Sequence, residues 1–421
     1  MRWHLTASAG LGVTIAMACV LPAAMAAARE IAPPQRRLRT YELRGKPRAV
    51  DISPDEKLAV VQVTQSQAAT SDPTQIRTVE LAQLWDFRQD RLVAEAQLEE
   101  VTTDKVHVPR DPFVPRFARF TADGQLIVIY LHRHCYVFTA SLRKLRLIEI
   151  SGPPDVTRLH KTRSGEHSSV ETARLTLLEI SPLEHTAAVV WVRGYDGLNY
   201  QVGLLDLDSG RKLGEWNMRD EGVGVWDPTA LVWSPNGRQL VFAVPNAFRC
   251  SSPGGAPDIF VVDAVSGRIR TQWTSGLLIG DIAVTPDQRV WTVDSGCIGV
   301  FKNHDPKMKV FDLLTGKRVR EFSGRESGVR YAVSASRKGD RVVAYTGKMK
   351  IKFDWGDMVS WSVPVDHTFS VWNSSNFEGL LTSQDWGLPR YDWQGAALPL
   401  VFRISAGGMF ALAGTTIYEL P

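Results

Sequence analysis

The sequence predicts an all-β fold made of repeated antiparallel units, and three observations predict it. Short apolar runs rich in Val, Leu, Phe and Trp recur along the chain, and several alternate with polar residues, which is the two-residue period of β-strands. Tight turns that begin with Ser or Thr join these runs, as in the stretch LVWSPNGRQLVFAV of residues 231–244. The same kind of turn recurs along the whole chain, so that the architecture follows from repetition.

The recurring turn has the chemistry of a type I turn. In Ser234-Pro235-Asn236-Gly237, the proline presets φ at the second position and the glycine relieves the fourth. Seven such turns are spaced about 50 to 70 residues apart. They begin at Ser53, Thr121, Ser181, Ser234, Thr285, Ser334 and Ser405.

A second hairpin follows the first in several units. Residues 204–216, 260–273 and 309–322 each read as a strand, an Asp, a Ser/Thr-Gly turn and another strand. Each unit therefore supplies four antiparallel strands, which we call A to D. Seven such units with weak copies of one pattern predict a seven-bladed β-propeller over residues 38–421.

The chain resembles the WD40-like family in a divergent, bacterial-type form. Trp85-Asp86 is the Trp-Asp pair at the expected end of a C strand, whereas the Gly-His dipeptide of the family is missing. The last unit has three strands before the sequence stops, so we expect residues 36–45, RRLRTYELRG, to complete it. Such an overlap would close the ring and remove its open sheet edges.

The N-terminus has the pattern of an export signal. A short basic start is followed by an apolar, Ala-rich stretch that ends in Ala24-Met25-Ala26, which predicts a signal peptide over residues 1–26 and a linker over 27–37. The protein would then be periplasmic or secreted, with no transmembrane span in the mature chain. The alternatives are a retained membrane anchor and lipoprotein processing at Cys19.

Export decides how the three remaining cysteines are interpreted. Cys250 and Cys297 fall in B–C loops of consecutive units, so we expect them to form a disulfide in an oxidising compartment. Cys135 opens an apolar strand, CYVFTA, and is expected to serve as a small buried hydrophobic residue.

Loop lengths divide the predicted ring into two faces. The A–B and C–D turns share one face and are tight, whereas the B–C loops and D–A links share the other and hold the long insertions. These insertions are residues 64–78, 98–115, 151–171, 245–257, 294–306, 346–367 and 383–397. Long loops on a rigid scaffold commonly carry function, with tolerated surface insertions as the alternative.

Aromatic residues favour the loop face as a partner-binding site. They are Trp355, Trp361, Trp386, Tyr391 and Trp393, all in the insertions of the last two units. Aromatic side chains give large contact areas at low entropic cost, which suits a protein or peptide partner. They could instead cover neighbouring blades.

The sequence contains few catalytic patterns. It lacks Gly-x-Ser-x-Gly, His-Glu-x-x-His and phosphate-binding glycine loops, and we assign no catalytic residue, metal or cofactor. His132 and His134 could bind a metal together, but two histidines without a third ligand fit a polar B–C connection better. Asp206, Ser209, Gly210 and Trp216 approach the repeat of quinone-dependent propellers, and we interpret them as turn chemistry.

The hypothesis from sequence is an exported, non-catalytic propeller that binds a protein or peptide through its loop face. The alternative is a small propeller enzyme, or a cofactor- or ligand-binding protein, with its site at the loop-face mouth of the central channel. A net charge of +4 without a long basic run gives no basis for nucleic-acid binding. A weaker alternative, binding of an anionic surface or polysaccharide, depends on the basic residues of segment 36–48.

Overall fold

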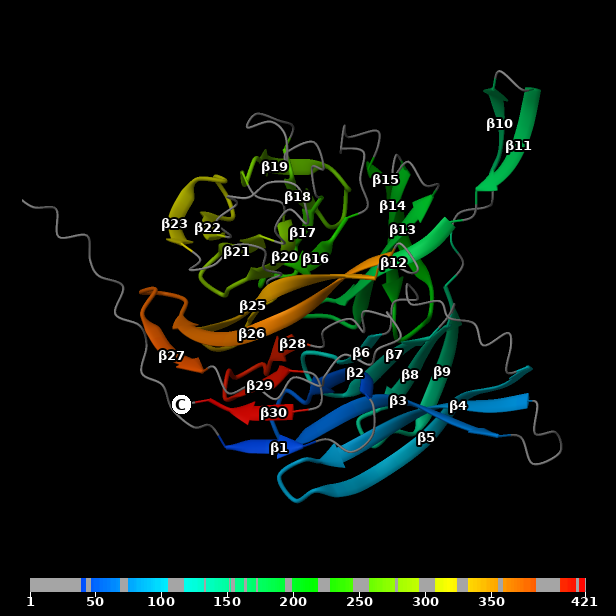
Figure 1. Ribbon diagram of the computed structural model, residues 1–421, viewed down its shortest axis with the longest axis horizontal. Coiled ribbons are helices and arrows are strands. Elements are labelled where there is room, and N and C mark those ends of the chain that lie inside the picture. The colour runs from blue at the N-terminus through cyan, green and yellow to red at the C-terminus, as the bar shows by residue number, and fades with distance from the viewer. Residues whose placement is uncertain are drawn as a thin grey trace, which may run out of the picture. The chain divides into compact units, whose positions relative to one another are not determined.

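The computed structural model describes residues 39–420 apart from 43–46, 69–74, 105–116, 132–133, 151, 153–155, 163–164, 172, 194–198, 219–227, 245–256, 277–278, 295–306, 324–331, 355–358, 384–401 and 414–415. Contacts divide the chain into residues 1–32 and residues 33–421, and every described residue belongs to the second unit. The regular elements of that unit are the strands β1 to β30 (Figure 1). None of the described residues lies in a helix long and apolar enough to cross a membrane.

Seven sheets of four antiparallel strands form the ring, and each sheet is one blade. Strands A to D follow one another in sequence within blades 1 to 3. Blade 1 is β2 (Pro47–Ile52), β3 (Leu58–Ala68), β4 (Gln75–Asp86) and β5 (Arg91–Asp104). Blade 2 is β6 (Phe117–Phe120), β7 (Leu126–Leu131), β8 (His134–Thr139) and β9 (Lys144–Glu149). Blade 3 is β12 (Ala173–Ile180), β13 (Thr186–Arg193), β14 (Asn199–Asp206) and β15 (Lys212–Asn217).

Blades 4 to 6 repeat this order, and blade 7 departs from it in one strand. Blade 4 is β16 (Ala230–Trp233), β17 (Gln239–Ala243), β18 (Ile259–Asp263) and β19 (Ile269–Trp273). Blade 5 is β20 (Ile279–Val284), β21 (Arg289–Asp294), β22 (Lys307–Asp312) and β23 (Arg318–Ser323). Blade 6 is β24 (Ala332–Ala335), β25 (Arg341–Asp354), β26 (Val359–Asn373) and β27 (Gly379–Ser383). Blade 7 holds β28 (Phe402–Ile404), β29 (Phe410–Ala413) and β30 (Thr416–Glu419), which confirms the seven-bladed prediction.

An N-terminal strand supplies the outer strand of blade 7. β1 (Thr40–Glu42) pairs antiparallel with β30, with Thr40 opposite Tyr418, and the sheet order is β1-β30-β29-β28. In Figure 1 the blue strand β1 lies beside the red strand β30. The predicted closing strand within residues 36–45 is therefore confirmed, and segments from both ends of the ring share one sheet.

Glu56 in the A–B turn of blade 1 also holds this junction. Its Oε1 accepts hydrogen bonds from the Ser405 hydroxyl and from the backbone N–H groups of Gly407 at 3.0 Å and Met409 at 3.3 Å. All three donors lie in the A–B turn of blade 7. One carboxylate therefore binds the turn of the last blade to the turn of the first.

The A–B turns have the geometry that their sequence predicts. In blade 4, the Gly237 N–H donates to the Ser234 carbonyl at 2.9 Å, and Gly237 has a φ of +65°. A left-handed residue after a type I turn matches the twist of the two strands that it joins. In blade 6 the predicted turn at Ser334 is wrong by two residues. Its hydrogen bonds start from Ser336, whose N–H donates to the Arg341 carbonyl at 2.9 Å.

The apolar core is divided among the blade junctions. Seven clusters of buried residues each join two consecutive blades, and one of them joins blade 7 to blade 1 through Phe410, Leu412 and Trp85. Trp291, which is fully buried, packs between blades 5 and 6 in the same way. Because every blade buries both of its faces, the ring gains most of its hydrophobic stabilisation only when neighbouring blades are in place.

The Asp–Gly–Trp pattern belongs to turns and blade contacts. The Asp206 carboxylate accepts the Ser209 N–H at 2.7 Å and so caps the C–D turn of blade 3. A Cβ built on Gly267, in the C–D turn of blade 4, would lie 2.4 Å from Cγ of Trp216. The tryptophan of one blade therefore packs on the glycine turn of the next, and the interpretation as turn chemistry holds.

The insertion at residues 346–367 is largely a β-ribbon rather than a loop. β24 pairs with β25 only up to Tyr345, whereas β25 and β26 stay paired as far as Asp354 opposite Val359. The expectation of a loop was wrong here, because the alternation of Lys with apolar residues in KMKIKF continues the strand period.

Two further insertions also carry strands. β3 and β4 extend through most of segment 64–78 and stay paired to Ala68 opposite Ile76. In segment 151–171, β10 (Val156–Thr162) and β11 (Gly165–Glu171) form a separate two-stranded sheet between blades 2 and 3. Figure 1 shows this hairpin projecting from the ring at the upper right. We call these three extensions the ribbons, and the face of the B–C and D–A connections the ribbon face.

Candidate functional site: the ribbon face and the central channel

Most of the aromatic residues proposed from the sequence fall outside the described part of the chain. These are Trp355, Trp386, Tyr391 and Trp393. Trp361 lies in β26, where it is opposite Lys352 of β25. The aromatic binding site therefore remains a prediction, with one of its members placed on a ribbon.

Of the three cysteines that follow the predicted signal peptide, one lies within the described residues and two lie outside them. Cys250 and Cys297, predicted to form a disulfide, lie outside the described residues. Cys135 is fully buried in the cluster between blades 2 and 3, and burial raises the pKa of its thiol. Its predicted role as a small buried hydrophobic residue is confirmed. His134 lies in β8, opposite Leu131, whereas His132 is outside the described residues.

The two faces of the ring differ in construction. The A–B turns are closed by hydrogen bonds between residues four or five apart, for example Ser53 N–H to Leu58 O at 2.8 Å. The B–C and D–A connections include all three ribbons. Exposed backbone edges on such ribbons can pair with an extended strand of another chain.

A central cavity of about 450 Å³ runs along the channel. The A strands of all seven blades line it. At its A–B end, the second residue of each turn forms a collar that consists mostly of proline and alanine. The collar residues are Pro54, Ala122, Pro182, Pro235, Pro286, Arg337 and Ala406. Six of these seven residues are proline or alanine, and the seventh is Arg337, which Lys338 follows in the lining. The alternative hypothesis placed the channel site at the other, loop-face mouth.

Charged residues line the interior of this cavity. Glu179 of blade 3 accepts hydrogen bonds from two arginines of other blades, at 3.4 Å from Arg337 Nη2 and at 3.1 Å from Arg403 Nη2. Because these arginines belong to blades 6 and 7, the ion pairs cross the channel. Burial raises the pKa of Glu179, and the Arg119 and Arg337 charges oppose that rise.

Two aspartates in the channel join neighbouring blades through the backbone. Asp51 Oδ2 accepts the N–H of Phe120 in blade 2 at 2.9 Å, and Asp281 Oδ2 accepts the N–H of Val333 in blade 6 at 3.0 Å. Burial raises the pKa of Asp281 to about 7, the backbone hydrogen bonds only partly offset it, and the Glu179 charge adds to the rise. Burial also raises the pKa of Asp51, with Arg119 and Arg337 acting against it.

The sequence contains a signal for four of the six channel charges, although none of the six was predicted as a site residue. Asp51, Arg119, Glu179 and Arg403 each stand two residues before the first Ser or Thr of an A–B turn. A charge at this inward-facing position of an innermost strand is exceptional, because charged residues are rarely buried unless paired. No group of three metal-ligating side chains is found within the described residues.

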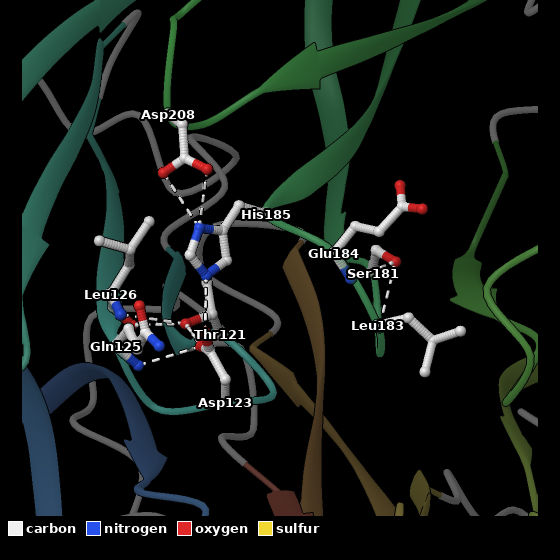
Figure 2. A network of polar contacts seen from close by, with 9 residues as sticks. All are labelled: Thr121, Asp123, Gln125, Leu126, Ser181, Leu183, Glu184, His185 and Asp208. Carbon is white, nitrogen blue, oxygen red and sulfur yellow. Dashed lines mark hydrogen bonds and ion pairs between the residues drawn. The ribbon is translucent and has the colours of Figure 1, made fainter.

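A second polar network lies on the A–B face between blades 2 and 3. The ring of His185 stands between two carboxylates, with Nδ1 2.9 Å from Asp208 Oδ2 and Nε2 2.9 Å from Asp123 Oδ2 (Figure 2). Burial alone would lower the pKa of His185, but its hydrogen bonds to Asp208 and Asp123 outweigh burial and raise it. We call this group the histidine clasp, since Asp123 belongs to blade 2 and the other two residues to blade 3.

Comparisons with known proteins support the architecture. No family model and no curated protein matches the chain. Among solved structures, the RRP9 WD40 repeats match 93% of this chain and 99% of their own at 11% identity, with a TM-score of 0.52. The structure of U3-55K matches 92% of this chain and 100% of its own at 12% identity, with a TM-score of 0.51. The Neurospora crassa Pan2 WD40 domain matches 92% of this chain and 98% of its own at 12% identity, with a TM-score of 0.52. The chain therefore has the seven-bladed propeller fold of WD40-repeat domains.

Proposed function

We propose that the mature chain is an exported, non-catalytic module that binds a protein or peptide through its ribbon face. The observation that carries this proposal is the asymmetry of the ring. Strand extensions occur on the B–C and D–A side, whereas the described A–B and C–D turns are tight. A rigid ring that adds length on one face offers a large surface there at little entropic cost.

The fold favours the same function by analogy. WD40 propellers commonly bind proteins, and the structural matches are WD40 domains. In sequence, the aromatic residues Trp355, Trp361, Trp386, Tyr391 and Trp393 fall in a B–C and a D–A connection, so we expect them on the ribbon face. Residues of this kind dominate the binding energy of many protein interfaces.

Capture of a partner by matched variants tests the proposal. The bait is the chain from residue 27, incubated with an envelope extract of its own cells. In the first variant, residues 347–367 are replaced by Asn-Gly, which leaves Thr346 paired with Thr368 and a two-residue turn between them. In the second variant, Trp386, Tyr391 and Trp393 are replaced by Ala.

The control carries Leu183→Ser on the opposite face, where the Leu183 side chain is 65% exposed. We expect wild type and control to capture the same partner, and at least one ribbon-face variant to lose it. Capture that is unchanged by both ribbon-face variants and lost in the control would place the interface on the A–B face and contradict the proposal.

A further inference from the structure

Basic side chains gather at the C–D turns of five consecutive blades. We call the basic arc the C–D turns of blades 1 to 5 together with the first residues of each strand D, which are residues 87–93, 140–147, 207–213, 264–270 and 313–320. The basic arc holds twelve Arg and Lys residues, of which all but Arg146 are exposed, and two acids, Asp90 and Asp208. Because equivalent turns of a ring lie on the same face, the fold brings together charges that form no long basic run in the sequence. The twelve are Arg88, Arg91, Arg143, Lys144, Arg146, Arg211, Lys212, Arg268, Arg270, Lys317, Arg318 and Arg320.

Most of these charges are not neutralised within the ring. Four of the twelve form an ion pair with a nearby carboxylate, for example Arg270 with Asp263 at 2.7 Å. The other eight form no ion pair with any residue that the structure describes. The aspartate before four of the turns is half-buried and accepts N–H groups of its own turn, as Asp312 does from Thr315 at 2.8 Å. The exposed charge of the basic arc is therefore mainly positive.

Exposed aliphatic residues stand among the same basic residues. Of the ten large hydrophobic residues that are exposed within the described part of the chain, eight lie in the basic arc. They include Val265, Leu314 and Leu213, which are 88%, 62% and 57% exposed. The other two, Leu183 and Met409, belong to A–B turns on the same face. Single exposed aliphatic residues are ordinary, but their concentration at one set of turns indicates a contact surface.

An anionic bilayer fits both kinds of side chain. Arg and Lys near a membrane surface are attracted to anionic head groups, and aliphatic side chains beside them gain free energy by entering the boundary between head groups and acyl chains. A soluble polyanion would contact the charges and leave the aliphatic side chains in water. A bilayer is also flat over the width of the ring, so consecutive turns on one face can contact it together.

We propose that the basic arc docks the chain on a bilayer that contains anionic phospholipid, with Arg and Lys on the head groups and the aliphatic side chains inserted beside them. The C–D turn of blade 6, residues 374–378, contains Glu378 and no Arg or Lys, so the contact covers blades 1 to 5. The ribbon face lies on the opposite side of the ring and stays free for a partner. Docking through the basic arc does not require that partner. It also differs from the anionic-surface alternative in segment 36–48, whose residues lie outside the arc.

Vesicle sedimentation of the chain from residue 27 tests the proposal. One set of vesicles is phosphatidylcholine with about 30% phosphatidylglycerol, and the other is phosphatidylcholine alone. We expect the chain to bind the anionic vesicles about tenfold more tightly or better. This binding should weaken about tenfold between about 50 mM and about 500 mM NaCl, because salt screens the attraction to the head groups.

A charge variant and a matched control locate the surface. The variant combines Arg143→Gln, Arg268→Gln and Lys317→Gln, which removes three exposed charges without ion pairs from blades 2, 4 and 5. It should weaken binding to the anionic vesicles about tenfold or more, because each basic residue near the surface adds attraction. The control removes the same charge from β25 on the ribbon face and should change binding less than about threefold. It combines Lys348→Gln, Lys350→Gln and Lys352→Gln.

A second variant separates insertion from charge. It combines Leu145→Ser and Leu314→Ser, whose side chains are exposed in blades 2 and 5. It should weaken binding to the anionic vesicles about tenfold and leave the salt dependence unchanged, since it removes inserted apolar surface and no charge. Because all five substituted residues of the basic arc are exposed, both variants should unfold in urea as the wild type does.

Four results would overturn the proposal. They are equal binding to both kinds of vesicle, no binding to either at about 1 mM lipid, an equal loss of binding in the β25 control, and vesicle affinity unchanged by Leu145→Ser with Leu314→Ser. The last result, together with binding of dextran sulfate that the charge variant loses, would identify a soluble polyanion as the occupant of the basic arc.

Discussion

Replacement of His185 by glutamine should weaken the junction of blades 2 and 3 at low pH and much less at high pH. The imidazolium stands between Asp208 and Asp123, with both ring nitrogens 2.9 Å from a carboxylate oxygen. Because these bonds raise the pKa of His185 in the folded state, its stabilisation is complete below the unfolded value of about 6.5. It is lost as the pH rises through the folded-state pKa.

The solvent exposure of these three side chains sets how much His185→Gln should lower the free energy of unfolding. The side chain of His185 is 20% exposed, those of Asp123 and Asp208 are 41% and 66% exposed, and solvent therefore screens both ion pairs. Pairs of this kind each contribute about 0.2–1 kcal/mol. We expect His185→Gln to lower the free energy of unfolding by about 1 kcal/mol at pH 5.5 and by less than about 0.5 kcal/mol at pH 8.5.

Urea unfolding at the two pH values measures this difference. The wild type alone is not sufficient, because the pKa of Asp281, Asp51 and Glu179 is also raised and these acids too make the fold more stable as the pH falls. The comparison must therefore be wild type minus variant at each pH. An effect of His185→Gln that is equal at pH 5.5 and 8.5, or larger at pH 8.5, would refute the reasoning.

Three further substitutions test the blade junctions and the channel, each by urea unfolding. Glu56→Ala removes the acceptor of three hydrogen bonds and should lower the free energy of unfolding by about 1–3 kcal/mol. Its control is Glu184→Ala, at the same turn position of blade 3, which should change the free energy of unfolding by less than about 0.5 kcal/mol. Gly267→Ala places a Cβ 2.4 Å from a tryptophan of blade 3, whereas Gly124→Ala has a similar φ but its nearest contact is at 3.3 Å. Gly267→Ala should therefore lower the free energy of unfolding by about 1–3 kcal/mol more than Gly124→Ala does. Glu179→Ala removes the acceptor that joins two channel arginines across the ring and should lower the free energy of unfolding by about 1–3 kcal/mol. A loss below about 0.5 kcal/mol would show that solvent screens these contacts.

Local sequence patterns were sufficient for the ring but not for every register. The turn in blade 6 was misplaced because positions 334 and 336 are both serine. A shift of the strand register by two residues leaves the same side chains on each face of the sheet, so the apolar pattern does not distinguish the two. Pairing with Arg341 decides between them, and that contact is formed only in the sheet. The ribbon at residues 346–367 was predictable from its alternation, which we interpreted as loop composition.

The polar sites depended on contacts between blades. His185, Asp123 and Asp208 lie in three turns of two blades, and no sequence spacing brings them together. Four of the channel charges, Asp51, Arg119, Glu179 and Arg403, could have been noticed from their common position before the A–B turns. Their pairing could not, since Glu179 meets arginines that are 158 and 224 residues away in sequence.

Hydrogen–deuterium exchange of the chain with and without its captured partner tests the central claim most directly. We predict that protection appears on the ribbon face, in residues 346–367, and in the aromatic segment 383–397, while the A–B turns exchange as they do in the free chain. Protection confined to the A–B and C–D turns, with the ribbons unchanged, would contradict binding through the ribbon face.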